Sequence, residues 1–219
     1  MTGQVLIKNY DHVSVNVDEI FRYAGIQQVS LQDEELIKQC FVEAEGGFRF
    51  RVCYSVFPVQ IMGDDVQFGF AKATSKHLAK HLANCDKAIV FCATIGLDID
   101  RLIAKYGVLS PAKALAFQAI GAERIESLCE LFDEEMRAEY NNLTPRFSPG
   151  YGDLDLAFQS AIFSVLDCSK KIGVTLTNTL LMTPSKSVTA IMGISNKACG
   201  KEKLGCKSCN NKGCGFRRE

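Results

Sequence analysis

Four cysteines near the C-terminus have the spacing of a thiolate site for a metal or cluster. Cys199, Cys206, Cys209 and Cys214 follow the pattern Cys-x6-Cys-x2-Cys-x4-Cys, and three glycines lie between the first and the last of them. Four thiolates can bind zinc or an iron–sulfur cluster with enough free energy to fold a short segment outright. The spacing does not decide between zinc and iron–sulfur.

The segment that carries these cysteines also differs in charge from the rest of the chain. Residues 197–219 hold seven basic and two acidic residues, a net charge of +5, while the 219-residue chain is neutral, so the other 196 residues carry −5. The segment has almost no side chain that could build an apolar core. A thiolate site would order it, and the basic residues would neutralise the site. We therefore expect a domain over residues 1–195 and a cysteine-ligated tail over residues 196–219.

A second candidate for chemistry is the loop Arg146-Phe-Ser-Pro-Gly-Tyr-Gly152. The guanidinium of Arg146 is a planar fork suited to a carboxylate. Pro149 fixes a turn, Gly150 lets backbone approach a ligand, and Tyr151 offers a ring face and a hydroxyl. The residues fit a small-ligand loop, and an ordinary turn between helices is the alternative.

The remaining composition excludes several classes of protein. Ten cysteines in 219 residues are too few for a disulfide scaffold, and six of them are scattered singly among mostly apolar neighbours, as expected of buried thiols. Balanced charge argues against binding nucleic acid or a membrane over the whole surface. The N-terminus lacks a secretion signal and the apolar runs are short, which predicts a cytoplasmic protein. Motifs for dinucleotides, nucleoside triphosphates and serine hydrolases are absent.

Hydrophobic periodicity predicts an α+β fold, an antiparallel sheet with long helices. Apolar spacing and caps predict helices after Asn16 and over residues 31–44, 74–84, 98–106, 111–140 and 156–171. Alternation predicts strands over residues 5–8, 48–62, 66–70 and 88–93, and β-rich stretches over 173–181 and 187–194. His77 and His81 are four apart on one of these helices, but Lys76 and Lys80 beside them favour a solvated face over a metal site.

A series of motifs resembles a known family. The series begins with Arg146-x-x-Pro-Gly-Tyr and about 20 largely helical residues, and continues with Gly173–Thr177, Met182-x-Pro184 and Ser187-Val188. It is similar to the reactivation (AdoMet-binding) domain of cobalamin-dependent methionine synthase. The helix from Gly121 to Arg137 resembles that domain too, with Glu126 in register. The resemblance is closest over residues 112–194.

The resemblance implies reductive methylation. In that family the domain presents AdoMet while an electron donor reduces cob(II)alamin, and methyl transfer restores methylcobalamin. By this likeness Arg146 would hold the methionyl carboxylate, Pro149, Gly150 and Tyr151 would shape the pocket, and Glu126 would be a further contact. The protein would act as an AdoMet-dependent methyl-transfer component whose task is to orient a methyl group.

The chain departs from the family in ways that predict its partners. Asp11-His12 is followed by Val-Ser-Val, so the Asp-x-His-x-x-Gly cobalamin motif of the full-length enzymes is missing. Cobalamin would be carried by a separate methionine synthase, on which this chain acts in trans, with an electron donor protein as a possible second partner. The cysteine tail takes the place of an aromatic-containing family segment, and an iron–sulfur cluster there could pass the electron.

Two other functions remain open at this stage. The chain could be a binding module that recognises a protein or nucleic acid through a metal knuckle and its basic tail. Nucleic acid is disfavoured, because Phe216 is the lone aromatic residue there and base stacking needs several. Alternatively, the AdoMet domain could reactivate a different corrinoid methyltransferase.

Overall fold

The computed structural model describes residues 3–195 of the chain. Cys199, Cys206, Cys209 and Cys214, and the tail predicted to begin at residue 196, lie outside the described residues. The described part has an α+β fold, as predicted. Its helices are α1 (Val17–Tyr23), α2 (Leu31–Glu45), α3 (Lys76–His81), α4 (Asp98–Leu109), α5 (Pro111–Glu139), α6 (Phe158–Leu166) and α7 (Cys168–Ile172). Its strands are β1 (Leu6–Tyr10), β2 (Phe50–Met62), β3 (Asp65–Phe68), β4 (Lys72–Thr74), β5 (Cys85–Thr94), β6 (Thr175–Leu176), β7 (Met182–Thr183) and β8 (Ser187–Ser195).

One antiparallel sheet forms the centre of the fold. Its order is β4-β3-β2-β5-β8, and β1 pairs with the first part of β2. The long strand β2 pairs with β5 over residues 51–58 and with β3 over residues 59–62. The predicted hairpin between β2 and β3 is confirmed, and its turn needs Gly63, whose φ is +65°. Strands β6 and β7 form a separate two-stranded ribbon.

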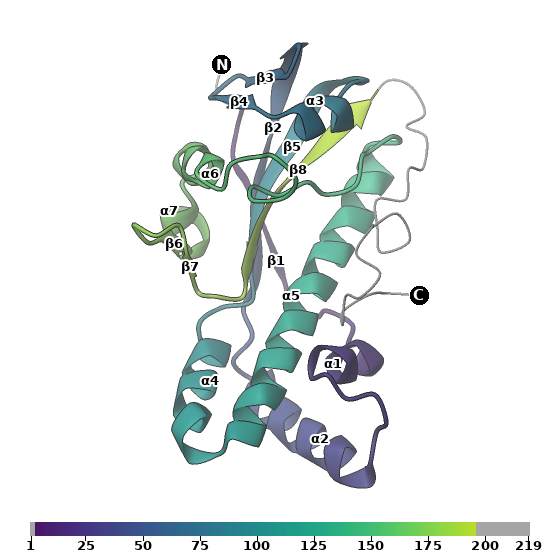
Figure 1. The fold of residues 1–219 in the computed structure, drawn as a ribbon, viewed down its shortest axis with the longest axis vertical. Coiled ribbons are helices and arrows are strands. Elements are labelled where there is room, and N and C mark those ends of the chain that lie inside the picture. Colours follow the sequence, from purple (N-terminus) through teal and green to yellow (C-terminus); the bar gives the residue numbers. More distant parts are fainter. Residues whose placement is uncertain (1–2, 196–219) are drawn as a thin grey trace.

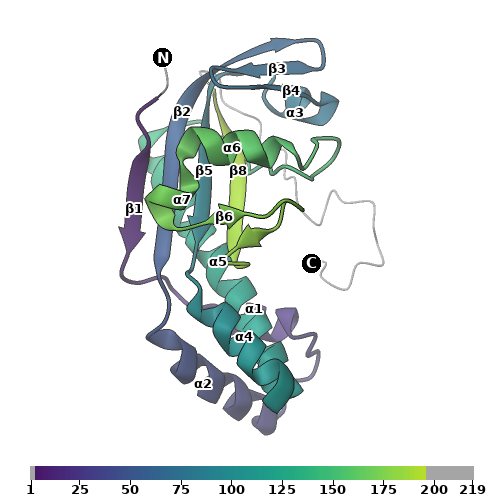
Figure 2. The same cartoon turned by 90° about the vertical axis from the view of Figure 1, so that its left-hand side faces the viewer.

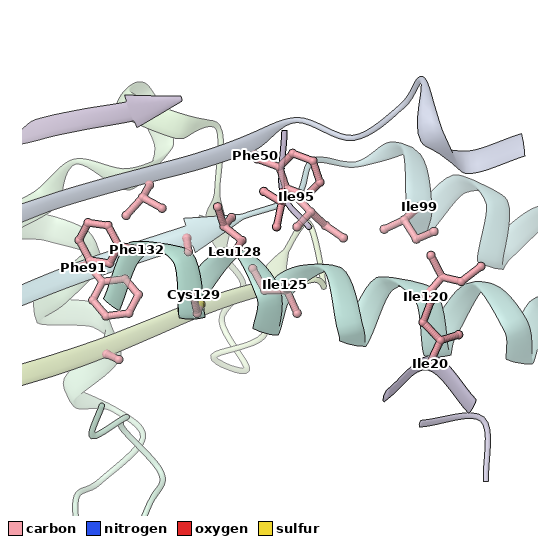
Figure 3. Packing of buried hydrophobic residues seen from close by; sticks show 14 of the residues in the cluster. Ile20, Phe50, Phe91, Ile95, Ile99, Ile120, Ile125, Leu128, Cys129 and Phe132 are labelled. Atoms are coloured by element: carbon pink, nitrogen blue, oxygen red, sulfur yellow. The ribbon is translucent and has the colours of Figure 1, made fainter. Parts of the chain in front are cut away.

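Alternating side chains of the sheet feed two hydrophobic cores, one on each face. Val52, Phe91 and Met192 pack toward α1, α2 and α5, whereas Cys53, Val90 and Ile191 pack toward α3, α6 and α7. Figures 1 and 2 show α5 on one face of the sheet and α6 with α7 on the other. The close-up in Figure 3 shows Leu128, Cys129 and Phe132 of α5 packed together with Phe91 of β5.

Helix α5 is the longest element of the described chain. Pro111 occupies its first turn, where the missing N–H costs nothing, and the helix ends one residue before the predicted end. Its 29 residues span about 43 Å, so it runs past the sheet and also packs against α1, α2 and α4 (Figure 1). One helix thus joins the sheet to the helical end of the molecule.

The helix predicted over residues 156–171 is wrong in one respect, because it is two helices. Asp167 adopts a left-handed conformation with φ +50° and separates α6 from α7. Aspartate tolerates this region better than most residues. The break turns the chain so that Cys168 and Ile172 are buried against the sheet, and an apolar period cannot reveal such a turn.

A buried ion pair attaches the N-terminal segment to the middle of α5. The side chains of Glu123 and Arg124 are only 1% and 2% exposed, and their charges are in contact. Arg124 also donates to the carbonyls of Val13 and Ser14, and Glu123 accepts from the backbone N–H of Asn16 at 2.8 Å. Both charges are therefore hydrogen-bonded, as burial demands.

Within residues 3–195, no helix combines the length and the apolar composition needed to cross a bilayer.

We predict that Arg124→Met lowers the free energy of unfolding by roughly 3–5 kcal/mol, because it leaves Glu123 buried without its partner. The matched control is Arg101→Met, which removes a guanidinium from an exposed pair with Asp98 and should cost less than about 1 kcal/mol. Urea unfolding of the two variants measures the difference. Equal losses would contradict the importance of the buried pair.

Candidate functional site

The segment that carries Arg146 lies along the outer edge of β8. Thr144 donates its backbone N–H to the carbonyl of Gly193 at 3.0 Å, and Phe147 exchanges two hydrogen bonds with Ile191 at 2.9 Å. The segment is extended there, so neighbouring side chains point to opposite faces. Phe147 enters the core beside α6, while Arg146 points toward α5. Pairing with the sheet thus determines where the guanidinium lies.

Arg146 forms two ion pairs with α5. Its Nε lies 3.0 Å from Oδ2 of Asp133, and its Nη2 lies 3.2 Å from Oε2 of Glu126. The two acidic residues are seven apart, two turns of one helix face. The structure therefore brings together Arg146 and Glu126, which the sequence placed twenty residues apart.

Asp133 is a member of this site that the sequence analysis missed. Burial raises the pKa of its carboxyl to about 6, although the charges of Arg146 and Arg137 act in the opposite direction. Within the described residues, its Oδ1 is buried without a hydrogen-bond partner. The seven-residue spacing from Glu126 is the signal that could have identified it. A desolvated carboxylate beside an arginine is common at functional sites.

Pro149, Gly150 and Tyr151 form the turn that follows Arg146. Pro149 is buried, and Gly150, with φ +84°, donates its N–H to the carbonyl of Leu154 at 2.9 Å. Tyr151 is 59% exposed, and its ring meets the ring of Phe147 edge-on at 5.3 Å. The loop therefore presents an aromatic ring to solvent while its own backbone is hydrogen-bonded. We call residues 145–153 the Arg146 loop.

A polar pocket of about 170 Å³ lies between the start of α1 and the middle of α5. Four glutamates line it, together with Asn16: Glu19, Glu123, Glu126 and Glu130. Because Glu126 also pairs with Arg146, the acidic pocket continues into the guanidinium site. The glutamates of the pocket would attract a positively charged group of a ligand, and the guanidinium of Arg146 would attract a negatively charged one. Pockets for whole ligands are typically about 300–1,000 Å³, so this one would enclose part of a ligand.

The histidines and the six cysteines of the described residues do not form a metal site. Among residues 3–195 there is no group of three or more His, Cys, Asp and Glu side chains that could hold a metal ion. His77 is exposed, as predicted, but His81 is half-buried, with its Nε2 2.9 Å from the carbonyl of Pro145. Five of the six scattered cysteines are buried and Cys85 is half-buried, which agrees with the role predicted for them.

We predict that Asp133→Asn changes how stability depends on pH. A raised pKa means that the stability contributed by the protonated group is present below about pH 4 and is lost as pH rises through about 6. The variant should lack this loss, so its free energy of unfolding should fall by about 2 kcal/mol less than that of the wild type between pH 4 and pH 7. Urea unfolding across this range measures it. Parallel profiles would contradict the assignment.

Comparison with known proteins identifies the family and the fold of the chain. Residues 72–200 match the family model described as vitamin B12 dependent methionine synthase, activation domain. A solved structure titled "Crystal Structure of the MetH Reactivation Domain bound to AdoHcy" resembles the chain with a TM-score of 0.64 and 16% identity, over 90% of this chain and 80% of that chain. At this identity the likeness concerns the fold. No curated protein matches. Since the family model covers more than half of the sequence, the chain belongs to the family of vitamin B12 dependent methionine synthase activation domains.

Proposed function

We propose that this protein binds AdoMet and reactivates a cobalamin-dependent methionine synthase as a separate partner. The observation that carries the proposal is the contact of Arg146 with α5, at the point where the acidic pocket begins. Family membership supports it, and so does the AdoHcy-bound relative with the same fold. Association with the synthase follows from the role of an activation domain.

The charges of AdoMet match the charges of the site. AdoMet carries a carboxylate, an ammonium and a sulfonium. Arginine has five N–H donors; Arg146 donates one to Glu126 and pairs through its Nε with Asp133, so its other donors can bind the carboxylate. The carboxylates of Glu126 and its pocket neighbours would stabilise the cationic groups. Tyr151, with Pro149 and Gly150 behind it, would supply the exposed ring face for the rest of the ligand.

The task of these residues is to bind and orient. One electron from a donor would reduce the partner's cob(II)alamin to cob(I)alamin, which would take the methyl group of AdoMet to give methylcobalamin and release S-adenosylhomocysteine. Holding a methyl group in line with its acceptor can contribute several kcal/mol to such a reaction. We include a cytoplasmic location in the proposal, and it is supported by the six free thiols of the described residues.

We predict that the full-length protein binds AdoMet and that Arg146→Ala weakens binding by about 10- to 100-fold, the loss of one or two charge-assisted hydrogen bonds. Isothermal titration calorimetry measures the affinity. Arg101→Ala is the matched control, because it removes an arginine that pairs with Asp98 on α4, and it should bind like the wild type.

The same variants test the reaction. Recovery of methylcobalamin is followed spectroscopically with the synthase, AdoMet and a reductant, and Arg146→Ala should need correspondingly more AdoMet for the same recovery. The ligand assignment would be wrong if the wild type did not bind AdoMet, or if Arg146→Ala and Arg101→Ala bound it equally well.

The proposal extends to the tail, where Cys199, Cys206, Cys209 and Cys214 would hold an iron–sulfur cluster or zinc. Their spacing and the basic residues around them support it. We predict that anaerobically purified protein contains iron or zinc and that the double variant Cys206→Ser, Cys209→Ser loses it. Elemental analysis measures the metal, with Cys85→Ser as the control that keeps it.

The identity of the metal separates two roles for the tail. Iron with acid-labile sulfide would assign the tail to electron transfer toward cob(II)alamin. One equivalent of zinc without iron would make it a structural clip, and the absence of both metals would overturn the site.

A further inference from the structure

Helix α3 holds one end of the Arg146 loop through Asp153. The carboxylate of Asp153 accepts hydrogen bonds from the hydroxyl of Ser75 and from the backbone N–H groups of Lys76 and His77, at 2.9 and 3.2 Å for the latter two. The Ser75 hydroxyl lowers the pKa of Asp153, so the group is a carboxylate near neutral pH. The loop thus ends on the first turn of a helix about 75 residues earlier in the chain.

The other end of the Arg146 loop is held by the last turn of the same helix. Nε2 of His81 lies 2.9 Å from the carbonyl oxygen of Pro145, and because a carbonyl can only accept, His81 donates from Nε2. The imidazole also contacts the ring of Phe147, with centroids 5.1 Å apart, and Phe147 meets the ring of Tyr151. A continuous series of contacts therefore joins α3 to the exposed ring of the loop.

Between these two ends the loop lies directly on α3. Gly152 has φ +63°, and a Cβ there would come within 2.6 Å of Nδ1 of His77. A side chain at position 152 would be strained by the positive φ and would also displace the exposed ring of His77. Helix α3 is itself anchored, since Leu78 within it and Leu82 directly after it are fully buried in the core. It is therefore a rigid support rather than a mobile neighbour.

We propose that Asp153 and His81 are positioning residues, which hold both ends of the Arg146 loop on α3 and so fix Arg146 and Tyr151 for the ligand. The proposal rests on the function proposed above. Neither residue is required to begin α3, because Ser75 caps that helix itself by accepting from the N–H of Leu78 at 3.0 Å. The contacts of Asp153 and His81 instead join this helix to the two ends of the loop.

The first test is hydrogen–deuterium exchange of the full-length protein without ligand. In Asp153→Ala the amides of Gly150, Tyr151 and Leu154, whose hydrogen bonds lie in the loop or join it to Leu154 directly after it, should exchange faster, while the sheet and α5 keep their protection. Asp155→Ala is the matched control, because this aspartate lies in the same connection but caps only the N–H of Ala157. Asp153→Asn retains one acceptor oxygen and should lie between the two.

His81 is tested with a second set of variants. His81→Phe keeps a ring against Phe147 but removes the donor to Pro145, so it should loosen the loop as Asp153→Ala does. His81→Gln keeps an N–H donor and should restore part of the protection. His12→Phe, at an exposed histidine outside the loop, should exchange like the wild type.

The second test is AdoMet affinity under conditions where all variants remain folded. Asp153→Ala and His81→Phe should bind about 5- to 10-fold more weakly, because a displaced loop no longer presents Arg146 in register. When Tyr151 is already replaced by alanine, the same substitutions should weaken AdoMet binding by a smaller factor, because part of their effect acts through Tyr151.

The outcomes separate the two proposals. Loss of protection spread over the whole protein would show a general structural role and overturn the positioning role, as would loop exchange and affinity equal to those of Asp155→Ala. If the wild type does not bind AdoMet, the proposed function fails, and the exchange measurements still decide whether α3 fixes the loop.

Discussion

The buried guanidinium of Arg124 is the constraint on which the site depends. Its donors and the carboxylate of Glu123 need partners inside the protein, and they find them in the backbone of residues 13–16. The N-terminal segment must therefore cross α5 at this point, and α1 begins directly afterwards. That crossing forms one wall of the acidic pocket, so a stability requirement of the core also creates the polar surface next to Arg146.

Where Arg146 contacts α5, burial and charge act in opposite directions on the pKa of Asp133. Asp133 is desolvated enough for its pKa to be raised, yet the adjacent guanidinium stabilises its ionised form. Glu126 shares the same guanidinium at a more exposed position. A ligand carboxylate would share this guanidinium with the two groups. The site is therefore preorganised, because its positive charge is held in place before any ligand arrives.

Sequence patterns predicted most elements of the fold, because β2, β5, α2 and α5 have clear periods and end signals. The α6–α7 break was missed, since Asp167 changes the direction of the chain without changing the apolar pattern. For the candidate site, the motif predicted Arg146 and Glu126 but not Asp133, Asp153 or His81. Their roles arise from contacts between segments far apart in the chain, such as Asp153 with the start of α3, and one sequence does not encode such contacts as a local pattern.

The pairing of the Arg146 segment with β8 has a consequence for solubility. Strand β8 is the last strand of the sheet, and an uncovered edge offers its N–H and C=O groups to the strands of other molecules. Thr144 and Phe147 occupy those groups over the second half of β8. Any motion that lifted this segment away to admit a large partner would expose an aggregation-prone edge. The need to keep this edge covered therefore restrains how far the segment around Arg146 can move.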